Sequence, residues 1–294
     1  WAEGCTSCAI ALVHGYRYPQ HEQIAAALAE AAGFEQISVS HQVSPLIKLV
    51  SRAETTVVDA YLSPVLRRYV NQVRSTLAGP NREALAGKLF FMQSNGGLTD
   101  ADRFRGKDAV LSGPAGGIVG AVQTCVAAGF EQIVTFDMGG TSTDVSHYAG
   151  EFERQFETQV AGVRMRAPMM SIHTVAAGGG SLLEFDGARL RVGPRSAGAM
   201  PGPVCYDLGG TEPTVTDADV ALGYISPETY FSGRMPLNRA KAVAAIEQEI
   251  ARPLGVSVDE AAAMIRNIVE ENMASAIKRE VHLRGYRPED FALF

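Results

Sequence analysis

The stretch FDMGGTSTDV, residues Phe136–Val145, follows directly on an apolar run that begins at Ile133. Glycine has no Cβ, so the pair Gly139-Gly140 lets backbone amides approach an anion closely. The hydroxyl groups that come next add further hydrogen-bond donors. This order of residues predicts a phosphate-binding turn between two strands, which would form one half of an ATP site. The residues assigned to the phosphates are Gly139, Gly140, Thr141, Ser142 and Thr143.

Two carboxylates flank the turn, and both are candidate ligands of Mg²⁺ or of its waters. Asp137 ends a strand that the apolar run predicts to be buried, and a buried carboxylate usually has a charged or metal partner. Asp144 has a second interpretation, in which it only caps the turn.

An ordinary hairpin turn between two strands is the main alternative, because Gly-Gly followed by Thr and Ser also suits that structure. The predicted burial of Asp137 is the observation that counts against it. The chain contains neither G-x-x-x-x-G-K-S/T nor a helix-opening G-x-G-x-x-G, the two commoner nucleotide loops. A strand–turn–strand loop instead favours an ATPase of the actin, Hsp70 and sugar-kinase type.

Further segments along the chain resemble the hydantoinase A and 5-oxoprolinase family of ATP-dependent ring-opening amidohydrolases, whose relatives include subunits of acetone and acetophenone carboxylases. Several long matches in order are far more specific than any one of them. Besides FDMGGTSTDV, the matching segments are SHQVSP (residues 40–45), FMQSNGGL (91–98), LSGPAGG (111–117), IHTVAAGGGS (172–181), GPRSAGAMPGPVCY (193–206) and TVTDAD (214–219).

The resemblance implies an α/β fold, namely the two-lobed actin/Hsp70/sugar-kinase-like ATPase fold, incomplete at both ends. Residues 1–129 would be the C-terminal part of the first lobe, with an inter-lobe helix near 114–128, and residues 130–294 would be the second lobe. A first phosphate loop is expected upstream of Trp1, and an adenosine-binding glycine segment after Phe294. The family commonly has Asp where this chain has Ser171, which calls a metal or proton role at that position into question.

Further site roles follow from the resemblance and from nearby residues. The mechanism that the resemblance implies gives Asp137 a catalytic role, in which it positions magnesium-bound water or the attacking group. His173 would orient substrate or a water, or else be a buried, hydrogen-bonded histidine. The run Gly178, Gly179 and Gly180 would contact phosphate through its amides, or would simply allow a tight loop. Gly113 is assigned to the nucleotide site at the start of the inter-lobe helix. A basic cluster, Arg189, Arg191 and Arg195, suits a phosphate or carboxylate, with solvated surface arginines as the alternative.

The activity implied is ATP-dependent ring opening of a cyclic amide, such as 5-oxoproline or a hydantoin, by phosphorylation of the amide oxygen. ATP and Mg²⁺ are the cofactors. A second subunit or a fused hydantoinase B-like half, in an oligomer, is the expected partner. The segment 168–180, and Tyr286 followed by Phe291-Ala292-Leu293, read closer to the oxoprolinase branch. Alternatives are the ATP-binding subunit of an acetone-carboxylase-type enzyme, a non-catalytic nucleotide-binding lobe, and a kinase for a sugar or an acid.

Composition fits about two domains of a globular enzyme: 294 residues, 46% hydrophobic, 20% charged and a net charge of −6. The acidic balance argues against nucleic acid or an anionic membrane as partner. No run of 18 apolar residues is present. The four cysteines contain one C-x-x-C pair without a second pair to complete a zinc site, so reduced thiols in the cytoplasm are expected.

Helical and strand patterns alternate along the chain, as in α/β proteins. Pro64 should kink or divide a long helix over residues 52–78. A capping box at Ser257 to Glu260 opens a helix with one apolar face made of Ile265, Ile268, Val269, Met273 and Ile277. Also expected are helices at 20–32 and 115–128, strands at 36–40, 88–93, 133–136 and 143–148, and Gly/Pro-rich loops over 178–210.

Overall fold

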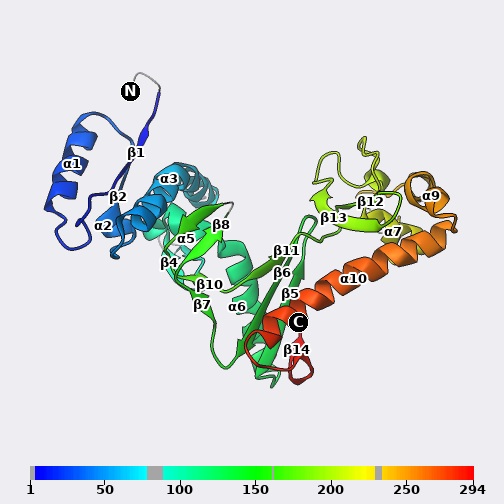
Figure 1. Ribbon diagram of the computed structural model, residues 1–294. Coiled ribbons are helices and arrows are strands. Elements are labelled where there is room, and N and C mark those ends of the chain that lie inside the picture. Colours follow the sequence, from blue (N-terminus) through cyan, green and yellow to red (C-terminus); the bar gives the residue numbers. More distant parts are fainter. Residues whose placement is uncertain (1–3, 78–88, 161, 229–233) are drawn as a thin grey trace. The chain divides into compact units, whose positions relative to one another are not determined.

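The computed structural model describes residues 4–77, 89–160, 162–228 and 234–294. The chain forms two compact units, each described here by itself (Figure 1). Unit 1 consists of Trp1–Thr124 and Glu151–Ser171, and unit 2 of Cys125–Gly150 and Ile172–Phe294. Among the helices of the described residues, none combines the length and apolar character needed to cross a bilayer.

Unit 1 begins with a βαβ arrangement. Strands β1 (Ser7–Ile10) and β2 (Gln36–Val39) pair in parallel, and helix α1 (Gln20–Ala31) connects them. Gly33 lies just after α1 with a φ of 91°, in the left-handed region that favours glycine and ends helices. Two short antiparallel strands follow later, β3 (Phe90–Met92) and β4 (Leu98–Asp100). The other α-helices that the structure describes in this unit are α2 (Ser40–Val43), α3 (Leu49–Leu77), α5 (Gly106–Ala109) and α6 (Ser112–Ala127).

Helix α3 is continuous through Pro64, so the proline does not divide it; a kink, the other expected outcome, stays a prediction. A proline inside a helix costs about 3 kcal/mol, because it removes one backbone hydrogen bond and crowds the preceding turn. Buried positions lie on both sides of the proline, among them Asp59 and Val70. The helix also packs on α5, β1, β2 and the later strand β9 (Val163–Met165). This tertiary packing offsets the local penalty.

The excursion Glu151–Ser171 packs with unit 1, although it follows strands of unit 2 along the chain. It contains β7 (Arg154–Gln155), β8 (Thr158–Val160), β9 and β10 (Met169–Met170). Its side chains Met165, Ala167 and Met169 are buried in one cluster with Val58 and Leu111. The first unit boundary falls inside α6. The excursion packs with unit 1 through contacts between residues far apart in sequence, so these units are not separated by a single division near residue 129. The assignment of the units to ATPase lobes stays a prediction.

Unit 2 is built around a four-stranded sheet in the order β11–β6–β5–β14. Strands β5 (Gln132–Met138) and β6 (Thr143–Ala149) form an antiparallel hairpin, as expected from the sequence. Strand β11 (His173–Val175) pairs with β6, and β14 (Ala292–Leu293) runs parallel to β5. Helix α10 (Val258–His282) contacts β6 and β11 and buries Val134 and Val145 from one face of the sheet (Figure 1).

Helix α10 begins as predicted, because Ser257 and Glu260 form a complete capping box. Its residues Ile265, Val269 and Met273 are buried in the main core of unit 2. The other predicted positions, Ile268 and Ile277, are partly buried against core clusters, which confirms the apolar face. Other helical segments of the unit include α7 (Val215–Leu222), α8 (Arg239–Ile246), the π-helical turn η4 (Glu247–Ala251) and α9 (Arg252–Leu254).

The Gly/Pro-rich segment was expected to form loops only. It also contains the hairpin of β12 (Ser181–Phe185) and β13 (Leu190–Ser196). Leu183 pairs with Val192, and both are buried against the core that contains α10. Gly193 has a φ of 68°, and a Cβ there would lie 2.7 Å from the Ala176 carbonyl oxygen. The high glycine content thus reflects close backbone packing around a hairpin.

Candidate functional site

The turn Gly139–Ser142 joins β5 to β6 at an exposed end of the hairpin. The Gly139 amide donates to the Ser142 carbonyl at 2.8 Å and closes the turn. Within the described residues, the amides of Gly140, Thr141 and Ser142 meet no hydrogen-bond acceptor. Gly139, Gly140 and Thr141 are exposed, and Ser142 is half-buried. Consecutive amides without internal partners, accompanied by two accessible hydroxyls, suit an oxyanion such as a phosphate.

A row of oxygen-bearing side chains crosses three strands beside this turn. Asp137 on β5 lies directly opposite Asp144 on β6, and Thr174 on β11 lies opposite Asp144. Directly opposed residues share a face of the sheet. The Thr174 hydroxyl donates to Asp144 Oδ1 at 2.7 Å. No cationic side chain in the described part of the chain pairs with either carboxylate.

The predicted burial of Asp137 is wrong, because its side chain is exposed at the end of β5. Burial in this strand stops at Thr135, and Asp137 and Met138 extend past the packed part of the sheet. The argument from burial against an ordinary hairpin therefore fails. The observation that now counts against an ordinary hairpin is the carboxylate pair, because like charges directly opposite each other destabilise a sheet unless a cation offsets them. The donor set, two carboxylates and a hydroxyl, suits Mg²⁺.

All three amides of the glycine run already donate hydrogen bonds. The Gly178 amide donates to Ser181 Oγ at 2.9 Å. The amides of Gly179 and Gly180 donate to the carbonyl oxygens of Gly139 and Gly140, at 3.1 and 2.7 Å. This geometry favours the tight-loop alternative: the run supports the turn from behind and has no amide left for a phosphate. A direct cofactor-binding role for these glycines stays a prediction.

Thr143 differs from the two hydroxyl residues before it. Its side chain is fully buried, and its hydroxyl donates to the Ala177 carbonyl at 2.7 Å. Thr141 and Ser142 are therefore the accessible hydroxyls of the turn. The buried Thr143 links the turn to the segment that leads into the glycine run.

Two other assigned residues are not brought into this arrangement. His173 lies opposite Val145, so it is on the face of the sheet that α10 covers, whereas Asp144 and Thr174 are on the other face. The sheet therefore separates His173 from the carboxylate pair. Gly113 lies at the start of α6 in unit 1, outside the arrangement described for unit 2. The assigned roles of both residues stay predictions.

The basic cluster has partners on the surface. Arg191 pairs with Asp186 at 2.9 Å, and Arg195 pairs with Glu212 at 3.0 Å. Hydrogen bonds from the backbone amides of Arg189 and Ala188 hold the pKa of Asp186 below its ordinary value. These exposed pairs favour the alternative of solvated surface arginines.

Asp217 was not among the predicted site residues, yet it organises the segment that leads into α7. Its carboxylate is fully buried and accepts hydrogen bonds from the amides of Val204, Cys205 and Thr214 and from the Thr214 hydroxyl. Burial, followed by the nearby Asp217 carboxylate, raises the pKa of the Cys205 thiol. The three-residue spacing of Thr214 and Asp217, typical of a capping box, was the available sequence signal.

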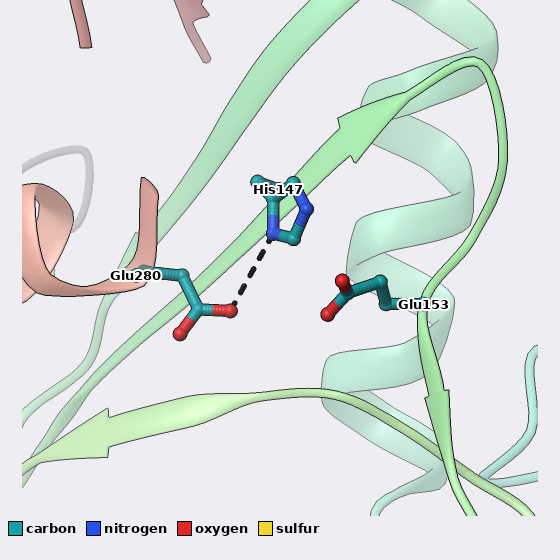
Figure 2. Close-up of side chains that lie close together, drawn as sticks. All are labelled: His147, Glu153 and Glu280. Carbon is teal, nitrogen blue, oxygen red and sulfur yellow. Dashed lines mark ion pairs between the residues drawn. The ribbon is translucent and has the colours of Figure 1, made fainter. Parts of the chain in front are cut away.

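A second polar group is buried under the other face of the sheet. Figure 2 shows the Nδ1 atom of His147 facing Oε1 of Glu280, 3.5 Å apart, and both side chains are buried. Arg284 pairs with the same carboxylate at 3.0 Å. These three residues belong to unit 2 and connect β6 to the end of α10. Glu153, also drawn in Figure 2, belongs to unit 1.

Comparison with protein families places this geometry in context. Residues 52–294 match the model of the hydantoinase/oxoprolinase family. The chain belongs to that family. It is 44% identical over 301 residues to the acetophenone carboxylase gamma subunit of Aromatoleum aromaticum, a match that covers 99% of this chain and 41% of that protein. It is 40% identical to 5-oxoprolinase 1 of Arabidopsis thaliana, covering 99% of this chain and 24% of that protein.

Solved structures of relatives confirm the α/β, ATPase-like fold. A nucleotide-free acetone carboxylase aligns over 100% of this chain and 42% of its own, with a TM-score of 0.84 and 27% identity. The ATP-dependent caprolactamase of Pseudomonas jessenii aligns over 97% of this chain and 42% of its own, with a TM-score of 0.78 and 41% identity. The chain thus spans less than half the length of these relatives.

Proposed function

We propose that this chain forms the part of an ATP-dependent enzyme that holds the terminal phosphates of ATP, and that the enzyme opens a cyclic amide such as 5-oxoproline or a hydantoin. One observation carries the proposal: the turn Gly139–Ser142 presents amides without internal partners next to an uncompensated carboxylate pair. Membership of the hydantoinase/oxoprolinase family supports it. So does the caprolactamase relative, whose name states ATP dependence.

In this proposal each group of the turn has a specific role. The amides of Gly140 to Ser142, with the hydroxyls of Thr141 and Ser142, donate hydrogen bonds to the β- and γ-phosphate oxygens. Asp137 and Asp144 would hold Mg²⁺, which would neutralise charge on those oxygens when bound. Thr174 keeps Asp144 oriented through its 2.7 Å hydrogen bond.

The chemistry explains why ATP is needed. A cyclic amide is a poor electrophile, and its oxygen is a poor leaving group. Transfer of the γ-phosphoryl group to the amide oxygen breaks the bond to ADP and gives an activated carbon. Water then adds to that carbon, and the carbon–nitrogen bond breaks to open the ring, with the nitrogen taking up a proton. A second water hydrolyses the acyl phosphate that remains, which gives a carboxylate and inorganic phosphate. Proteins assist such transfers mainly by positioning groups and stabilising charge.

A second candidate is the ATP-binding part of a ketone carboxylase. The 44% identity to a carboxylase gamma subunit and the TM-score of 0.84 to acetone carboxylase favour it. The role of the turn would be unchanged, because a ketone oxygen can be activated by phosphorylation in the same way. Relatives named as gamma and alpha subunits support a further proposal, that a second subunit or a fused half completes the enzyme.

The test is release of inorganic phosphate from ATP by the complete protein that contains this chain. Stimulation by 5-oxoproline or hydantoin supports the amidohydrolase, and stimulation by acetone or acetophenone with bicarbonate supports the carboxylase. A stable phosphorylated product would indicate a kinase, and no turnover would indicate a non-catalytic nucleotide-binding lobe.

Asp137→Asn tests the carboxylate pair within that assay. We expect substrate-stimulated turnover to fall by about 30-fold or more, because a lost charge interaction of this kind is worth about 2 kcal/mol or more. Asp259→Asn is the matched control, since Asp259 is exposed in the first turn of α10. Turnover of Asp137→Asn within about threefold of wild type would contradict the assignment.

A further inference from the structure

The glycine run and the phosphate turn are in direct backbone contact. Besides the hydrogen bonds from Gly179 and Gly180 to the turn carbonyls, a Cβ at Gly178 would lie 2.6 Å from the Gly139 oxygen and 2.8 Å from the Gly140 carbonyl carbon. A Cβ at Gly180 would lie 2.9 Å from the Gly140 oxygen. Real Cβ atoms do not approach backbone atoms this closely. Any larger residue at Gly178 must therefore displace the turn.

The far side of the run is attached to helix α7. The Gly179 carbonyl accepts hydrogen bonds from both the amide and the hydroxyl of Thr216, each at 2.8 Å. The Gly180 carbonyl accepts from the Ala197 amide at 2.8 Å, and the Gly178 carbonyl from the Ser181 amide at 3.0 Å. Every backbone group of the run thus has a partner. The run therefore lies between the turn and α7 and is hydrogen-bonded to both.

Helix α7 is itself held firmly. Its residues Val215, Ala218 and Ala221 are buried in the core that contains Ile265 and Val269 of α10. At its N-terminus the Thr214–Asp217 capping box is complete. A continuous path of contacts therefore connects the core of unit 2, through Thr216 and the glycine run, to the phosphate turn.

We propose that Thr216 and Gly178 are positioning residues for the phosphates of ATP: through the glycine run they hold the amides of Gly140 to Ser142 in the conformation that receives the terminal phosphates. This inference rests on the proposed function. The role proposed for both residues is indirect, since the Thr216 hydroxyl donates to the Gly179 carbonyl and the Gly178 amide to Ser181 Oγ. They favour ATP binding because the turn is already in the binding conformation and does not have to rearrange when the phosphates arrive.

The experiment measures the affinity of the complete protein for a non-hydrolysable ATP analogue with Mg²⁺ by isothermal titration calorimetry. Thr216→Val keeps the shape of the side chain and removes the hydroxyl. We expect it to weaken binding about fivefold, the equivalent of one ordinary hydrogen bond. Thr216→Ser keeps the hydroxyl and should stay within about twofold of wild type. Gly178→Ala should weaken binding by tenfold or more, because the turn must move.

Thr124→Val is the matched control. In the wild type the Thr124 hydroxyl also donates to a backbone carbonyl, that of Gly120, but on an exposed part of α6. Circular dichroism checks that each variant is folded at the assay temperature. Rescue by serine separates positioning from a general loss of packing. The inference is overturned if Thr216→Val binds as wild type does, or if the serine and valine variants are weakened equally.

Gly140→Ala distinguishes this inference from the proposed function. No protein atom lies within 4 Å of a Cβ at Gly140, so the folded chain accommodates alanine there. If this methyl group weakens binding of the analogue while Thr216→Val does not, the turn holds phosphate and only the positioning role is lost. If the wild type fails to bind the analogue, or Gly140→Ala leaves binding unchanged, the proposed function itself is overturned and the inference with it.

Discussion

Replacement of Asp217 by asparagine should destabilise unit 2 by an amount that follows from its hydrogen bonds. Oδ2 accepts from the Val204 amide at 3.1 Å and from the Thr214 amide and hydroxyl, both at 2.8 Å. Oδ1 accepts from the Cys205 amide at 2.7 Å. The side chain is fully buried, so water cannot replace a lost partner.

Asparagine can keep only one of these two acceptor atoms. In the better orientation its carbonyl oxygen takes the Oδ2 position, and its NH₂ group faces the Cys205 amide, donor against donor. One hydrogen bond to a charged acceptor is lost, worth about 1.5–3 kcal/mol, and a buried amide is left unsatisfied. The sum is about 3 kcal/mol. For a domain of roughly 150 residues or more this lowers the melting temperature by about 6–12 °C.

Differential scanning calorimetry of the complete protein measures the melting temperature of the transition that contains unit 2. Hydrogen exchange followed by mass spectrometry measures protection of the segment around Val204 and Cys205, which should fall in the variant. Asp259→Asn, on the surface of α10, should change the melting temperature by less than about 2 °C. An equally small change for Asp217→Asn, with protection retained around Cys205, would refute the reasoning.

Two further predictions concern titratable groups. Burial alone would raise the pKa of Glu22, but hydrogen bonds from Ser40, Leu12 and His41 outweigh it and hold the pKa below the ordinary 4.5. This carboxylate therefore contributes stability in full above pH 4.5, which is lost as the pH falls through the lower, folded pKa. Glu22→Gln should flatten the acid limb of the thermal unfolding curve measured between about pH 3 and pH 7, and an unchanged limb would contradict this. Iodoacetamide should label exposed Cys5 long before buried Cys205, whose thiol pKa is raised by burial and by Asp217; equal labelling rates of the native protein in mass spectrometry would contradict this.

Local signals in the sequence predicted the β5–β6 hairpin, the capping box of α10 and the apolar face of that helix. Each depends on residues that are neighbours along the chain: an apolar run next to a glycine pair, Ser257 with Glu260, and side chains spaced by one helical turn. Such patterns constrain the backbone before any tertiary contact forms. The family resemblance was likewise carried by contiguous segments, and the match over residues 52–294 confirms it.

The burial and the hydrogen-bond partners of these segments depend on which distant residues the fold brings near them, and local sequence patterns do not show this. The apolar run before Asp137 predicted burial, yet the side chain is exposed, because the packed sheet ends at Thr135. The run Gly178–Gly180 was compatible with either a phosphate or a tight loop. The amides of Gly179 and Gly180 donate to the carbonyl oxygens of Gly139 and Gly140, some forty residues earlier in the chain, and the Gly178 amide donates to Ser181 Oγ.

Composition and short-range periodicity therefore determined which elements form, since turns, caps and helix faces are decided by adjacent residues. Tertiary structure decided the availability of each polar group at the candidate site. Strand register placed Asp137 opposite Asp144 and put His173 on the other face. Hydrogen-bond donors are satisfied by whichever acceptor the fold brings within reach. That acceptor lies far away in sequence for the amides of Gly179 and Cys205 and for the hydroxyl of Thr143.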